Sequence, residues 1–144
     1  MNKDKIFNLF DDSPEAEEKM IEQKKSLRGY KNSPHYRLGM FTKLIVNHFL
    51  FHSKLEKFLK KEEPNYNVES TREASEFVVF NRAFSYLNNI TPLNKEVIVA
   101  VLDFDFKILN KTLHQSLQYF QDIEEYEKCA HILKFIKILK ENSK

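Results

Sequence analysis

The chain has 144 residues, a length that predicts a single domain able to bury a core without disulfides or metals. Its two glycines, Gly29 and Gly39, lie too far apart to form a common glycine-rich phosphate loop. The single cysteine excludes an internal disulfide and any zinc site that needs several cysteines. With 23 basic and 21 acidic residues the formal net charge is +2, so the total charge singles out no class of partner.

The N-terminal residues 1–12 predict a flexible segment and not a targeting signal. They lack the apolar core of a signal peptide, and the acids in and after them argue against a transit peptide. The longest apolar stretch, residues 38–51, is interrupted by Lys43, Asn47 and His48, and it is too short and too polar to cross a bilayer. We therefore expect a cytoplasmic protein with no membrane association, in which residues 13–144 form a helical bundle domain.

The first two predicted helices each begin at a serine–proline pair. Ser13–Pro14 supplies an N-cap and a proline in the first turn, and Gly29 is the expected end of this mostly polar helix. A second helix is predicted from Ser33–Pro34 to about Glu62, where a proline follows. This second helix is apolar around its middle, so we expect it to be central in the bundle. The residues of its predicted core face are Met40, Leu44, Phe51, Leu55 and Phe58.

Three further helices are predicted. Ser70 and Glu73 have the spacing of a capping box, which predicts a helix from residue 70 to Asn88. Thr91–Pro92 predicts the start of a helix that extends to about residue 121, with a break near Asn110 as one option. A second capping box, in residues 122–125, predicts the last helix, antiparallel to the one before it.

Residues 97–106 are compatible with a buried strand as well as with a helix, because they are rich in strand-forming residues. We favour a helix, since no partner strand is present and the apolar residues fit the helical period. The predicted fold is therefore all-α: a single-domain bundle of about five helices with a C-terminal helical hairpin.

Charge is segregated along the chain. Residues 24–61 carry ten basic residues and one acid, whereas residues 1–23 carry three bases and seven acids and residues 62–106 carry three bases and eight acids. The basic block predicts binding to nucleic acid or to an acidic protein, although the flanking acidic blocks could instead cover it in the folded chain. The candidate binding residues are Lys24, Lys25, Arg28, Tyr30, Lys31 and Arg37.

Three pairs of side chains have the residue types of catalytic or metal sites. His48 and His52 lie one helical turn apart, as paired metal ligands do, but the sequence indicates no third ligand. Asp103 and Asp105 would share a face only in a strand. Cys129 and His131 point to different sides of a helix, so a buried thiol is expected and not a nucleophile pair. We predict no catalytic residue, no metal and no cofactor.

The sequence favours a non-catalytic protein that acts by protein–protein interaction, as an adaptor, regulatory or assembly component of a bacterium or a phage. An apolar or charged helix face would bind a partner protein or a second copy of the chain. The alternative is a nucleic-acid-binding regulator that uses residues 24–61. Salt dependence separates the two, because phosphate contacts weaken steeply as the salt concentration rises.

Overall fold

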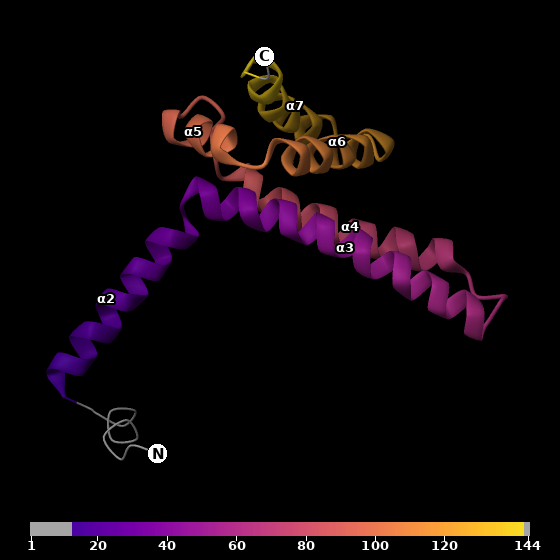
Figure 1. Cartoon of the computed structure of the whole chain (residues 1–144), viewed down its shortest axis with the longest axis horizontal. Coiled ribbons are helices and arrows are strands. Elements are labelled where there is room, and N and C mark those ends of the chain that lie inside the picture. The colour runs from indigo at the N-terminus through magenta and orange to yellow at the C-terminus, as the bar shows by residue number, and fades with distance from the viewer. Residues whose placement is uncertain (1–12, 143–144) are drawn as a thin grey trace. The chain divides into compact units, whose positions relative to one another are not determined.

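The computed structural model describes residues 13–142, so the segment predicted to be flexible, residues 1–12, lies outside the described residues. Residues 13–142 form six α-helices and no strand, which confirms an all-α fold with six helices in place of about five. The residues up to Ser33 and those from Pro34 onward form two compact units, and each is described by itself (Figure 1). The helices are α2 (Pro14–Lys31), α3 (Pro34–Glu62), α4 (Val68–Asn88), α5 (Lys95–Asp103), α6 (Phe106–Asp122) and α7 (Tyr126–Asn142).

α2 is a polar helix that buries none of its side chains. Its predicted start is confirmed, because the Ser13 side chain accepts a hydrogen bond from the N–H of Ala16 at 3.2 Å. The expected end at Gly29 is wrong: the helix continues to Lys31, and Asn32 follows as its C-cap. A glycine within a helix costs only about 1 kcal/mol relative to alanine, so the helix can continue through it.

α3 and α4 form an antiparallel pair and lie side by side (Figure 1). α3 begins at Pro34 and ends at Glu62, as predicted. The capping box predicted at Ser70 is wrong, because Asn67 is the N-cap of α4 and its side chain accepts from the N–H of Ser70 at 3.3 Å. Asparagine caps a helix as well as serine does, so the helix begins at the earlier residue.

The predicted fourth helix is two helices. α5 begins at Lys95 and not at Thr91–Pro92, because Asn94 is its N-cap. The chain breaks at Phe104, whose backbone is extended, and Asp105 then caps α6 by accepting from the N–H of Ile108 at 3.1 Å. The break expected near Asn110 is therefore six residues too late, and the residues that were compatible with a strand are helical on both sides of the true break.

α6 and α7 pack against each other and confirm the C-terminal hairpin. The capping box predicted in residues 122–125 is wrong, because Asp122 is the last residue of α6 and α7 begins at Tyr126. Glu124 lies between them with a positive φ of 61°, and the N–H of Glu125 donates to the carbonyl of Phe120 at 2.9 Å. This left-handed residue reverses the chain in a short turn.

The core of the second unit is concentrated at one end of the α3–α4 pair. The buried residues of α3 all precede Phe49, and those of α4 all follow Val79. α5, α6 and α7 pack on this end, and the rest of the pair extends beyond them (Figure 1). We call residues 51–78 the arm, and none of its side chains is fully buried. No helix of the described chain, α3 included, combines the length and the apolar character needed to cross a membrane.

Candidate functional site

The arm exposes apolar side chains on both of its helices. On α3, Phe51 and Phe58 are 65% and 59% exposed. They lie two helical turns apart on one face, with the half-buried Leu55 between them. On α4, Phe77 and Val78 are exposed as well. Exposed aromatic residues that recur on one helix face are typical of a surface that binds another molecule.

Basic side chains border the exposed phenylalanines of α3. Lys54, Lys57 and Lys61 recur at i, i+3 and i+7, which places them on one face beside Phe51 and Phe58, and all three are exposed. The only acid in residues 51–61 is Glu56, whose carboxylate accepts two hydrogen bonds from Arg72 of α4. α3 therefore presents a mixed apolar and basic surface. We call it the arm surface and define it by Phe51, Lys54, Leu55, Lys57, Phe58 and Lys61.

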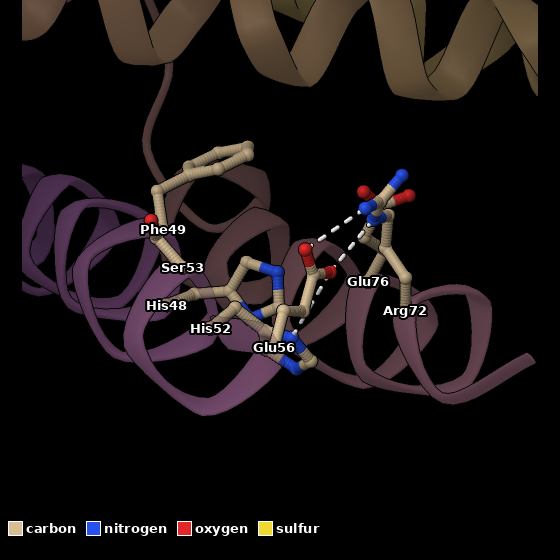
Figure 2. A pocket seen from close by; sticks show the side chains of 7 residues that line it. All are labelled: His48, Phe49, His52, Ser53, Glu56, Arg72 and Glu76. Carbon is tan, nitrogen blue, oxygen red and sulfur yellow. Dashed lines mark hydrogen bonds and ion pairs between the residues drawn. The ribbon is translucent and has the colours of Figure 1, made fainter. Parts of the chain in front are cut away.

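A polar pocket of about 350 Å³ lies between α3 and α4 at the base of the arm (Figure 2). His48, His52 and Glu56 line it from successive turns of α3, and Arg72 and Glu76 line it from α4. Arg72 Nε and Nη2 donate to Oε1 and Oε2 of Glu56, each at 2.9 Å. The imidazole centroids of the two histidines are 4.6 Å apart, and His52 Nδ1 lies 3.9 Å from Glu56 Oε1. The two histidine contacts lie within α3, whereas the hydrogen bonds of Arg72 with Glu56 join α4 to α3 in a part of the pair where no side chain is fully buried.

The ionisable groups of the pocket have shifted pKa values. Burial lowers the pKa of His48 from its ordinary value, and the neighbouring His52 lowers it further. Burial raises the pKa of Glu76, whereas the hydrogen bonds from Arg72 lower the pKa of Glu56. At neutral pH the pocket therefore holds a neutral His48 beside an ionised Glu56 that is already bound to a cation.

The pocket does not assemble the metal site that the histidine spacing would allow. In residues 13–142 no group of three or more His, Cys, Asp or Glu side chains is placed to hold a metal ion. Glu56 follows His48 and His52 along α3, but Arg72 bonds to both oxygens of its carboxylate. The geometry favours a structural role for the two histidines, as a contact between the arm and the core.

The other reactive side chains also hold the fold. Asp103 ends α5 and lies 3.5 Å from His35, and Asp105 caps α6, so their carboxylates serve different contacts. Cys129 is buried, and burial raises the pKa of its thiol. His131 Nε2 donates to the carbonyl oxygen of Leu87 at 2.7 Å, which joins α7 to the end of α4.

The predicted binding residues do not all lie in one unit. Lys24, Lys25, Arg28, Tyr30 and Lys31 are exposed on α2, whereas Arg37 is half-buried in the first turns of α3. Within α2, three of the basic residues, Lys24, Arg28 and Lys31, share one face at i, i+4 and i+7. They share this helix with four glutamates, so α2 as a whole carries five bases and four acids.

Sequence reasoning missed the arm surface because helical periodicity assigned its phenylalanines to the core. Phe51 and Phe58 continue the apolar face of Met40 and Leu44, and nothing in the spacing shows where the packing helices stop. One signal was present: the lysines become dense after residue 53, as on a solvated helix end.

Comparisons with protein-family models, with curated proteins and with solved structures found no match for this chain.

Proposed function

We propose that this chain is a non-catalytic protein that binds an acidic, amphipathic segment of a partner protein on the arm surface. The observation that carries the proposal is the exposure of Phe51 and Phe58, two helical turns apart, with three lysines beside them. Aromatic side chains are the usual anchors of protein interfaces because they bury a large area at a low entropic cost.

The chemistry of the arm surface defines the partner segment. An amphipathic helix with apolar residues at i, i+3 and i+7 would cover Phe51 and Phe58 along α3. Aspartate or glutamate on the edge of that helix would meet Lys54, Lys57 and Lys61, which would steer the association and fix its orientation. A non-catalytic role agrees with the reactive side chains, since Cys129 and His131 each serve the packing of α7.

Site-specific photo-crosslinking in the cells that make the protein tests this proposal. A benzophenone amino acid placed at residue 51 or 58 preserves an aromatic side chain at an exposed position. We expect both variants to form the same discrete adduct, since the two positions lie on one helix face. Replacing Lys54 and Lys57 together by glutamate should remove the adduct, because the partner surface is acidic.

Leu93 provides a matched control, because it is 86% exposed and lies outside the arm. A benzophenone residue at position 93 should not give the adduct. If positions 51 and 58 form no adduct, or form the same set as position 93, the arm surface is not the binding site.

Nucleic-acid binding through α2 is the second candidate, favoured by the shared face of Lys24, Arg28 and Lys31. Each phosphate contact releases counterions, so binding to labelled duplex or single-stranded DNA should weaken by orders of magnitude between about 50 and 200 mM salt. The charge reversals Arg28→Glu and Lys31→Glu should abolish it. The four glutamates of α2 argue against nucleic-acid binding, because they cancel most of the positive charge of this helix.

A further inference from the structure

α2 carries an apolar stripe of its own. Ala16, Met20, Gln23, Leu27 and Tyr30 follow one another at alternating steps of four and three, which is the spacing of a coiled-coil seam. Met20 and Leu27 are 55% and 53% exposed, and no side chain of α2 is buried. A helix with an exposed seam of this kind gains stability by pairing with another helix.

The charge distribution of α2 shows which helix would fit. From Pro14 to Glu22 it carries four glutamates and one lysine, and from Gln23 to Lys31 it carries four bases and no acid. A second copy that runs antiparallel places each acidic half against a basic half. A parallel copy places like charge against like charge along the whole helix.

The antiparallel register also pairs the residues of the seam with one another. In an antiparallel coiled coil the a positions of one helix lie opposite the d positions of the other, so Met20 lies opposite Tyr30 of the second copy and Gln23 lies opposite Leu27. Beside the seam, Glu17 faces Lys31 of the second copy on both sides of the axis. Lys24 facing Lys24 of the second copy is the one repulsive contact among these flanking pairs.

A parallel register is less favourable at the same flanking positions. It would place Lys19 beside Lys24 of the second copy twice, and it would leave Glu17 without a lysine opposite. The flanking charges thus select the antiparallel pair.

We propose that α2 is a self-association helix, through which two copies of the chain pair antiparallel about a two-fold axis. The proposal is independent of the arm surface, which lies on a different helix and takes a different partner. α2 has only 18 residues, so the dimer should be weak and should dissociate on dilution.

Sedimentation equilibrium of the full chain over a range of concentrations tests the pairing. Leu27→Glu should weaken the dimer at least about tenfold, since it removes a buried leucine on each side of the axis. Leu93→Glu is the matched control and should leave the dissociation constant unchanged, because Leu93 lies outside α2. A chain that remains monomeric at all concentrations overturns the proposal. So does a chain that dimerises only when an oligonucleotide is added.

Single cysteines in a Cys129→Ala background test the orientation. Gln23→Cys and Leu27→Cys should form a mixed disulfide-linked dimer under mild oxidation, because residue 23 faces residue 27 of the second copy. Neither variant alone should link to itself as fast, because no seam residue faces itself in the antiparallel pair. If Gln23→Cys alone links to itself faster than the mixed dimer forms, the pair is parallel and the proposed orientation is wrong.

A charge exchange tests the flanking contacts. Glu17→Lys should weaken the dimer, because it places two lysines opposite each other on both sides of the axis. Adding Lys31→Glu to the same chain should restore the dimer. Equal affinities for the single and the double variant would overturn the assigned register.

If Leu27→Glu lowers the melting temperature of a monomeric chain, the stripe packs on the chain itself, which also overturns the proposal.

Discussion

The two halves of the α3–α4 pair place the same residue types in different environments. In the packed half, Phe41 is fully buried and Phe84 is nearly so, because α5, α6 and α7 cover them. In the arm, Phe51 and Phe58 lie on the same helix as Phe41 and are more than half exposed. The arm is held by the bidentate contact of Arg72 with Glu56 in place of a core. Apolar periodicity thus reports that a helix has an apolar face, and it does not report what covers that face.

Truncating one phenylalanine in each half of α3 gives the largest expected contrast. Phe41→Ala should lower the free energy of unfolding by about 3–5 kcal/mol, since it empties a fully buried site. Phe58→Ala should change it by no more than about 0.5 kcal/mol, because that side chain is largely in water already. Urea titrations followed by circular dichroism measure both. If Phe41→Ala fails to fold, Phe41→Leu provides a milder variant, and similar losses in the two halves would refute the division.

Removing one N-cap in each half gives an intermediate effect. Asp105→Ala should cost about 1 kcal/mol of global stability, because Asp105 caps α6, which packs on the core. Asn67→Ala removes the cap of α4 within the arm, and its effect should be local. Amide hydrogen exchange should accelerate in the first turns of α4 with little change in the melting temperature. A cooperative loss of stability from Asn67→Ala would show that the arm and the core unfold as one unit.

The pH dependence of stability gives the smallest expected effect, and it arises where the two halves meet. The pKa of His48 is lowered in the folded chain from an ordinary value of 6.5 by burial and by His52, so the unfolded chain binds more protons below that pH. This contribution to stability is present above pH 6.5 and is lost as the pH falls through the folded pKa. The raised pKa of Glu76 acts in the opposite direction, since protonation of Glu76 favours the folded chain.

His48→Leu isolates the contribution of His48. The free energy of unfolding of the wild type should fall between pH 7.5 and 5.5 more steeply than that of the variant. Parallel urea titrations at several pH values measure the difference. A variant with the same slope as the wild type would show that His48 is not the group responsible.

Much of the fold could be predicted from local chemistry. Ser13–Pro14 and Glu62 mark helix ends that the structure confirms, because capping and proline geometry act within a few residues. The errors at Ser70 and Thr91 share one cause, because an asparagine near each predicted cap was equally able to cap the helix and is the residue that does so. At Asp122 the prediction fails because the preceding helix α6 continues through that residue.

Less of the candidate site could be predicted. The pocket residues His48 and His52 were recognised as a pair, but the contact of Glu56 with Arg72 joins residues that are distant in sequence. The exposure of Phe51 and Phe58 depends on where α6 and α7 end against the pair, and no local pattern in α3 encodes that position.

By itself the sequence determined the helical content, most helix boundaries to within a few residues, the C-terminal hairpin and the absence of a glycine-rich loop. These features follow from interactions within one or two helical turns, where side chain and backbone are neighbours in the chain. Only the tertiary structure decided which apolar faces are covered. Burial is a property of the contacts that α5, α6 and α7 make at one end of the α3–α4 pair, and those contacts join residues far apart in the sequence.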